Sequence, residues 1–211
     1  MADKEILIFV EGPSDKVFLE AYLYFLEDIP IKNFKVKDVT GKDNLSKRLL
    51  EIEKYDKTLI IFDADKDYES NKKEILSKTQ QKITEEQIFL FPNNKDDGDL
   101  ETLLLEIAKH DEFLKCFEGY LECIKSKEHY KPIKNISKSK WYAYLEVFEL
   151  QNFFKDKRNK NDKKNEEKII IDDKGKIRKE YKEEYEKLKE VIDFNSNSLI
   201  PLKDFLGQFA K

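Results

Sequence analysis

Three acidic residues lie at or just beyond the ends of two short apolar segments of the chain. Ile6 to Val10 is an unbroken apolar run that ends in Glu11, and Thr58 to Phe62 is a second run that ends in Asp63 and Asp65. Bounded runs of this length are typical of strands buried on both faces of a parallel sheet. The carboxyl ends of parallel strands meet at one edge, where open α/β sheets bind their ligands. We therefore expect Glu11, Asp63 and Asp65 to share a site.

Carboxylates that converge at a dry sheet edge repel one another, and this raises their pKa values unless a cation neutralises them. If the two strands are neighbours, Glu11 and Asp63 lie about 5 Å apart, and Asp65 can point the same way. A hard divalent cation with oxygen ligands, Mg²⁺ or Mn²⁺, neutralises such a set. The two cysteines and two histidines form no zinc-type cluster, which argues against zinc. The simpler interpretation, that Glu11 only ends a strand, stays open here.

The first part of the chain alternates between predicted strands and helices. Apolar runs and breakers predict strands at 6–10, 34–39, 58–62 and 88–91. Helices are predicted over 14–27, from Asp43 or Asn44 onward, over 68–81 and after a cap at Asp99. This order predicts an α/β fold, a parallel sheet of about four strands with helices on both faces.

The second part is predicted to be mainly helical. Helices are expected over 111–125, 137–150, 179–192 and 201–209, with the aromatic stripes of the first two in the core. Residues 155–168 predict a solvated loop and 168–177 a β-hairpin arm. We thus expect an α/β domain over 1–110 and a helical region over 111–211, in which 152–193 form a charged insertion or lobe.

Composition sets few limits on function. Lys and Arg number 40 against 44 Asp and Glu, so the net charge of −4 neither predicts nor excludes nucleic acid. No apolar stretch approaches the roughly 20 residues that span a bilayer, and the N-terminus does not resemble a signal peptide. Cys116 and Cys123 are about 10 Å apart along a predicted helix, too far for a disulfide. We therefore expect no membrane association and a cytoplasmic location.

Two motifs carry a resemblance to a known fold. The segments Val10–Lys16 (VEGPSDK) and Phe62–Asp65 (FDAD) resemble the TOPRIM fold, the metal-binding domain of topoisomerases, primases and OLD-family nucleases. That fold has a glutamate after its first strand and an Asp-x-Asp after its third. The resemblance covers roughly residues 5 to 110. Three further segments resemble DUF3226, a stand-alone TOPRIM-like group of bacterial proteins of unknown function: FPNNKDDGDLE (91–101), WYAYL (141–145) and PLKDFL (201–206).

The resemblance implies specific roles for the acids. Glu11, Asp63 and Asp65 would hold Mg²⁺ as the catalytic carboxylates, and Glu11 would also act as a general acid or base. Asp15 matches an acidic position that some OLD-type nucleases use for a second metal, although an acid in the first turn of a helix is equally expected there. Glu101, at the start of the helix after the fourth strand, would be a ligand or support one.

Phosphoryl transfer is the chemistry that suits such a site, and it predicts a nuclease or phosphodiesterase acting on DNA or RNA. Gly12 would let the backbone approach a ligand closely. Lys16 would contact a phosphate, but a solvated helix residue is the favoured interpretation. The chain lacks the G-x-x-x-x-G-K-[ST] loop of the ATPase that OLD-type nucleases usually carry, so a protein partner would have to supply it.

Two alternatives stay open. The chain would be a non-catalytic module that binds nucleic acid or protein, with phosphate contacts from the basic segments 134–140 and 155–168. In the other alternative, the carboxylates form ion pairs with lysines and bind no metal.

Overall fold

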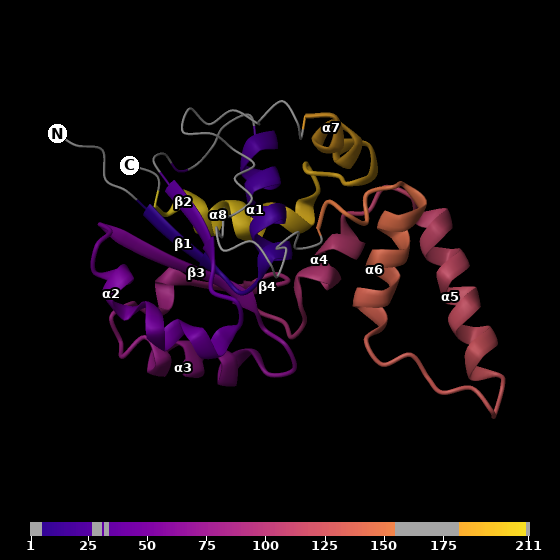
Figure 1. Ribbon diagram of the computed structural model, residues 1–211, viewed down its shortest axis with the longest axis horizontal. Coiled ribbons are helices and arrows are strands. Elements are labelled where there is room, and N and C mark those ends of the chain that lie inside the picture. The colour runs from indigo at the N-terminus through magenta and orange to yellow at the C-terminus, as the bar shows by residue number, and fades with distance from the viewer. Residues whose placement is uncertain (1–5, 27–30, 32–33, 155–181, 210–211) are drawn as a thin grey trace, which may run out of the picture.

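The computed structural model describes residues 6–26, 31, 34–154 and 182–209 (Figure 1). The strands are β1 Ile6–Val10, β2 Phe34–Asp38, β3 Lys57–Asp63 and β4 Ile88–Phe91. The α-helices are α1 Pro13–Phe25, α2 Leu49–Ile52, α3 Tyr68–Lys78, α4 Leu100–Glu106, α5 Asp111–Lys125, α6 Ile136–Val147, α7 Lys182–Val191 and α8 Ile200–Gly207. Short 3₁₀ helices are η1 Lys42–Arg48, η2 Glu85–Gln87 and η4 Asn197–Leu199.

The four strands form one parallel sheet in the order β2-β1-β3-β4. Ile8 of β1 is in register with Val36 of β2 and with Leu59 of β3. The predicted α/β class, the parallel sheet and the mainly helical C-terminal region are confirmed. Because β1 and β3 are neighbours that run in the same direction, the acids that follow them arrive at the same edge.

Each face of the sheet has its own core, as the alternation of side chains along a strand requires. Ile8 and Val10 point to the face covered by α1, α4, α6, α7 and α8. Leu7 and Phe9 point to the other face, where residues of η1, α2 and α3 pack. Helices therefore cover both faces of the sheet, as Figure 1 shows.

The helical C-terminal region shares the first of these cores. Trp141 and Tyr144 of α6 are at most 1% exposed and belong to the same cluster as residues of β1 and α1, which confirms that the aromatic stripe of α6 is core. The Tyr144 hydroxyl donates a hydrogen bond to the Val191 carbonyl of α7 (2.7 Å). The Ser14 hydroxyl at the start of α1 donates to the Phe154 carbonyl (3.2 Å). The division of the chain into two domains near residue 110 stays a prediction. Apolar residues from both sides of this position pack in the same core.

The expectation that the aromatic stripe of α5 lies in the core is wrong. No residue of α5 is buried, and Tyr120 is 51% exposed. Phe113 and Leu114, in the first turn, pack partly against the core. Figure 1 shows the reason, since α5 runs beside α6 and away from the sheet, so only its N-terminal end reaches the core.

Other boundaries shift only modestly. The helix expected from Asp43 or Asn44 is mostly the 3₁₀ helix η1, followed by one turn of α-helix. Asp99 caps α4 as predicted, because its side chain accepts a hydrogen bond from the Thr102 backbone N–H (2.8 Å). The loop expected at 155–168 and the hairpin expected at 168–177 lie outside the described residues. Among the described helices, none is both long enough and apolar enough to cross a bilayer.

Candidate functional site at the carboxyl edge of the sheet

Glu11 and Asp63 meet where β1 and β3 end. Val10 pairs with Ile61 across the two strands, so Glu11 follows β1 at the level where β3 approaches Asp63, its last residue. Burial raises the pKa of Glu11, and a hydrogen bond from the Asp63 backbone partly opposes that rise, so the Glu11 carboxylate lies at the end of β3. Its Oε2 atom is buried and has no hydrogen-bond partner within the described part of the chain.

Asp15 is fixed above this edge by the first turn of α1. Its Oδ2 atom accepts a hydrogen bond from the Gly12 backbone N–H (2.6 Å), and the residue is only 8% exposed. Gly12 is thus engaged by Asp15, and a Cβ there would lie 3.4 Å from that carboxylate oxygen. Lys16 is 7% exposed and its Nζ lies 4.0 Å from Glu20 Oε1, so the expectation of a solvated lysine is wrong.

The connection from β4 to α4 brings Glu101 to the same edge. The Asp63 carboxylate accepts a hydrogen bond through Oδ1 from the Leu100 backbone N–H, the first residue of α4 (2.9 Å). Glu101 follows directly and is 9% exposed. Asp63 therefore has two tasks, because it docks the start of α4 and contributes a carboxylate to the edge.

Four carboxylates, those of Glu11, Asp15, Asp63 and Glu101, form what we call the carboxylate cluster. Burial is the largest cause of a raised pKa for each of them. Burial, with the charges of Glu101 and Glu11, raises the pKa of Asp15 to about 7. Burial, with the charges of Asp15, Glu11 and Glu101, raises the pKa of Asp63 well above its usual range. The edge thus carries more buried negative charge than the neighbouring cations compensate.

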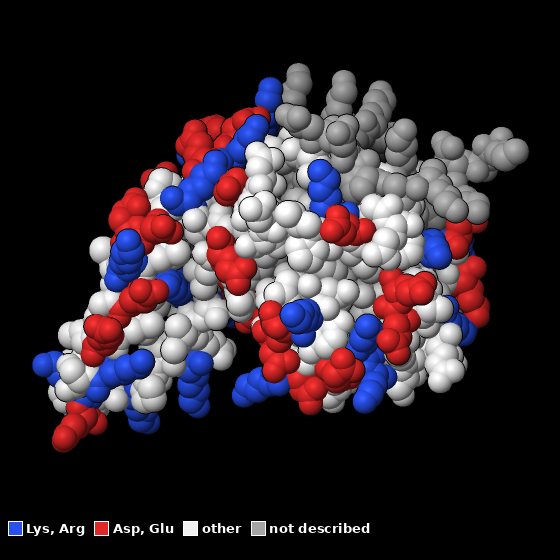
Figure 2. Space-filling model, turned by 180° about the vertical axis from the view of Figure 1, so that it is seen from behind, with Lys and Arg blue, Asp and Glu red and all other residues white. Residues whose placement is uncertain are grey.

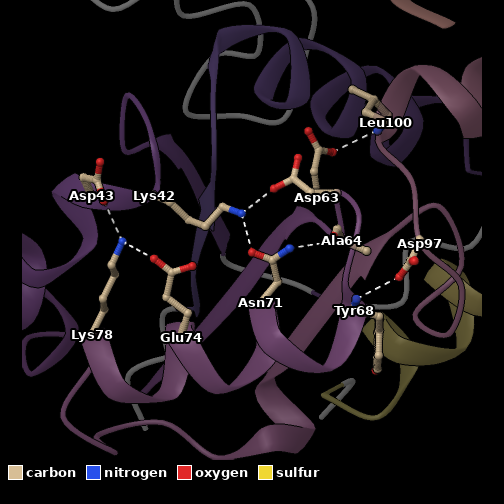
Figure 3. A network of polar contacts seen from close by, with 11 residues as sticks. Lys42, Asp43, Asp63, Ala64, Tyr68, Asn71, Glu74, Lys78, Asp97 and Leu100 are labelled. Atoms are coloured by element: carbon tan, nitrogen blue, oxygen red, sulfur yellow. Dashed lines mark hydrogen bonds and ion pairs between the residues drawn. The ribbon is translucent and has the colours of Figure 1, made fainter. Parts of the chain in front are cut away.

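Asp65 has a different environment from the carboxylate cluster. Its backbone has φ +54°, a left-handed conformation that Asp tolerates better than most residues, and it exchanges two backbone hydrogen bonds with Gly98 (2.7 and 2.8 Å). Its carboxylate forms an ion pair with Lys42 (2.5 Å), and the side chain is 53% exposed. Lys42 also donates to Asn71 Oδ1 (2.5 Å), and the Asn71 amide donates to the Ala64 carbonyl (Figure 3).

Two lysines approach the edge from opposite sides, and the sequence patterns singled out neither of them individually. Lys42, from η1 after β2, is the main influence that lowers the pKa of Glu11. Lys138 of α6 lies 3.9 Å from Glu101 and lowers its pKa. Asp15 and Asp63 form no ion pair with any described residue. The alternative in which the acids form ion pairs with lysines therefore applies to Asp65, and it does not apply to Asp15 and Asp63 among the described residues.

The donor set suits a hard cation, but the side chains are not gathered around one point. Within the described ranges, no three His, Cys, Asp or Glu residues are arranged so that they could hold a metal ion together. The carboxylate oxygens, the buried and unpartnered Oε2 of Glu11 and the raised pKa values match the chemistry of Mg²⁺ or Mn²⁺. The type and charge of these side chains therefore suit a divalent cation, but their positions do not yet surround one. Side chains at the edge would have to rotate to coordinate it.

A cavity of about 710 Å³ opens beside the carboxylate cluster. Its sheet-side lining includes Asp63, Asp65 and Glu101, and its opposite lining comes from the segment that leads into α6, with Lys134 and Lys138. Figure 2 shows the molecule from behind, with an indentation between the body and the projecting α5–α6 part and Lys or Arg side chains at its rim. A volume of this size is ordinary for small-ligand sites.

A search of the curated proteins and a search of the solved structures each gave no match. The profile of one family, described as "Protein of unknown function (DUF3226)", matches residues 5–210. The match runs from the start of β1 past the end of α8 and so includes the sheet, the carboxylate cluster and the helical C-terminal region. The chain belongs to the DUF3226 family.

Proposed function

We propose that the chain is a phosphoryl-transfer protein dependent on Mg²⁺ or Mn²⁺, a nuclease or phosphodiesterase acting on DNA or RNA. One observation carries the proposal: two buried carboxylates, Asp15 and Glu101, and two half-buried ones, Glu11 and Asp63, lie at the carboxyl edge of a parallel sheet. Among the described residues, Asp15 and Asp63 form no ion pair with a lysine, and Lys138 acts on Asp15 only through its charge. Buried carboxylates in this number must bind either protons or a cation. The resemblance of the Glu11 and Asp63–Asp65 motifs to the TOPRIM fold supports the cation.

The residues of the carboxylate cluster divide the work of such a site. Glu11, Asp63 and a third acid, Asp15, Asp65 or Glu101, would hold the cation. When bound, a divalent cation polarises a phosphodiester and stabilises charge on the leaving oxygen. Burial raises the pKa of Glu11, and a carboxyl group with a raised pKa suits proton transfer better than an ordinary glutamate does. Asp63 is kept in place by the Leu100 N–H, so its position does not depend on the ligand.

The first experiment measures cation binding by calorimetric titration with Mg²⁺ and with Mn²⁺ at pH 7.5. Wild type is expected to bind, and Glu11→Gln and Asp63→Asn are expected to lose binding. Glu122→Gln, an exposed carboxylate on α5, is the matched control and should bind as wild type does. Equal binding by wild type and Asp63→Asn would refute a site at this edge.

The second experiment tests the reaction itself. Labelled single-stranded and double-stranded DNA and RNA are incubated with the protein in Mg²⁺, in Mn²⁺ and in EDTA. Cleavage is expected only with a cation and only in variants that retain Glu11 and Asp63. Cleavage that is equally fast with Asp63→Ala would come from a contaminant and would leave the proposal without support.

A second candidate function is a non-catalytic module that binds nucleic acid or protein. The observation that favours it is the Lys42–Asp65 ion pair, which occupies one acid of the Asp-Ala-Asp segment with an ammonium instead of a metal. Steeply salt-dependent binding of DNA without cleavage or cation binding would select it. A protein partner that supplies an ATPase, and a cytoplasmic location, stay predictions.

A further inference from the structure

The cavity beside the carboxylate cluster has two walls of opposite charge. The sheet-side wall is mainly acidic, with five carboxylates and one lysine, Lys66, whereas the wall at the start of α6 contributes ammonium, hydroxyl and amide groups and no acid. The residues that line this second wall are consecutive: Lys134, Asn135, Ile136, Ser137 and Lys138. The chain thus presents a group of hydrogen-bond donors directly across the cavity from the acids.

The two lysines of this wall are available to a ligand. Lys134 is exposed, and the described part of the chain gives its ammonium no ion pair or hydrogen bond. The Lys138 side chain is 58% exposed, and its one ion pair with a described residue is the long contact with Glu101 (3.9 Å). Its charge also opposes the rise in the pKa of Asp15. A contact of this length in water holds an ammonium weakly.

The backbone at the start of α6 adds donors to the same wall. Asn135, at the N-cap position, makes no capping hydrogen bond with its side chain, and the first turn of this 12-residue helix contains no acid. The first N–H groups of a helix have no acceptor within the helix, and they carry its positive end. The residues of this first turn, from Asn135 to Lys138, line the cavity.

From this arrangement we infer that Lys134 and Lys138, with the start of α6, form a phosphate-binding wall for a phosphate ester held across from the carboxylate cluster. The inference rests on the proposed function, because the same phosphate would then face the cation-binding acids. Ile136 lies between the lysines, is 41% exposed and offers an apolar contact to a sugar or base. The volume of about 710 Å³ suits a mononucleotide or one segment of a single strand.

The test is the affinity for a fluorescein-labelled single-stranded oligonucleotide, measured by anisotropy in Mg²⁺ and in EDTA, with a mononucleotide as competitor. In Mg²⁺ at about 50 mM salt, Lys134→Ala/Lys138→Ala should weaken binding about tenfold or more. The slope of log affinity against log salt should become shallower by about 1.4, for two lost phosphate contacts. Lys125→Ala/Lys127→Ala, which removes two exposed lysines at the end of α5, should change affinity less than about twofold. Lys134→Arg/Lys138→Arg should restore binding.

The possible results distinguish the phosphate-binding wall from the proposed metal-dependent function. Equal losses in the two double alanine variants, or wild type that binds neither the oligonucleotide nor the mononucleotide in Mg²⁺ at low salt, would overturn the phosphate-binding wall. A mononucleotide that binds by itself in a lysine-dependent way, while the oligonucleotide does not, would identify the ligand as a nucleotide and keep the wall. Lysine-dependent binding in EDTA together with no cation binding by calorimetry would keep the wall and remove the proposed metal function.

Discussion

The ammonium nitrogen of Lys42 lies 2.5 Å from Oδ2 of Asp65, so the second acid of the Asp-Ala-Asp segment is neutralised by a lysine from the far side of β1. β2 delivers this lysine, because it pairs with β1 and leads into η1, where Lys42 is the first residue. The same ammonium influences Glu11. Lys42 therefore balances charge at the edge and competes with any cation bound there.

Replacing Lys42 should move stability and cation affinity in opposite directions. Lys42→Met removes the ion pair with Asp65 and the hydrogen bond to Asn71, so the free energy of unfolding in EDTA should fall by about 1 kcal/mol. The lost positive charge should strengthen Mg²⁺ binding several-fold at pH 7.5. Urea unfolding and calorimetric titration measure the two effects.

Lys78→Met is the matched control for Lys42→Met. Like Lys42, Lys78 makes two polar contacts with its ammonium group, in this case with Asp43 (2.7 Å) and Glu74 (2.6 Å), as Figure 3 shows. Its loss should leave Mg²⁺ affinity unchanged. Similar affinities in wild type and Lys42→Met would show that Lys42 does not share the electrostatic field of the carboxylate cluster.

Stability without metal should fall as the pH rises. The pKa values of Asp15, Asp63, Glu11 and Glu101 are raised in the folded chain, so the folded state holds more protons than the unfolded state above about pH 4. The free energy of unfolding in EDTA therefore decreases from about pH 4 through the folded pKa of Asp15 at about 7. Urea unfolding between pH 5 and 8 measures the slope, and Mg²⁺ should restore stability at pH 8.

Asp15→Asn is the control for this pH dependence. It removes one titrating group, while its amide oxygen can still accept the hydrogen bond from the Gly12 N–H. The slope of unfolding free energy against pH should become shallower in this variant. A slope identical to that of wild type would mean that Asp15 does not titrate in this range.

Two substitutions of Asp63 should separate its two tasks. Asp63→Asn keeps an acceptor for the Leu100 N–H and removes a buried charge, so it should stabilise the metal-free protein at pH 8. Asp63→Ala removes the acceptor as well and leaves that N–H unsatisfied, which costs about 1 to 3 kcal/mol relative to Asp63→Asn. Urea unfolding in EDTA compares them. Equal stability of the two variants would contradict the docking role of the carboxylate.

The helical C-terminal region should unfold together with the sheet. Trp141→Ala should destabilise by about 3 to 5 kcal/mol, because Trp141 is buried in the core that α1 and β1 share. Tyr144→Phe loses the hydrogen bond to Val191 and should cost about 1 kcal/mol. Tyr120→Phe, on the exposed face of α5, should change stability by less than about 0.5 kcal/mol.

A single unfolding transition, seen equally by tryptophan fluorescence and by circular dichroism, is expected in wild type, Tyr144→Phe and Tyr120→Phe, and circular dichroism alone follows Trp141→Ala. The only tryptophan is Trp141, so fluorescence in Tyr144→Phe and Tyr120→Phe reports on α6, while circular dichroism reports on all helices. Two separate transitions would support an independently folding unit after residue 110.

Much of the fold was readable from the sequence because local signals and burial agree in this part of the chain. Continuous apolar runs predicted three of the strands and the alternating segment 34–39 predicted the other, all to within a residue or two. The alternation of strands with helices predicted a parallel sheet. The evidence from sequence was weaker for α5, where the spacing of aromatic residues alone led to the prediction that the helix lies in the core. Periodicity reports that a helix has an apolar side, and it does not report whether anything covers that side.

At the site, the sequence by itself determined that Glu11 and Asp63 stand at the ends of buried strands, because strand ends and carboxylates are both local features. The tertiary structure made these two strands neighbours. Only the tertiary structure decided which acids share the buried edge. It placed Asp15 and Glu101 with Asp63 through backbone hydrogen bonds at two helix starts, and it turned Asp65 toward Lys42. The directions of side chains at strand ends depend on loops from distant parts of the chain, and residue type and spacing do not encode those directions.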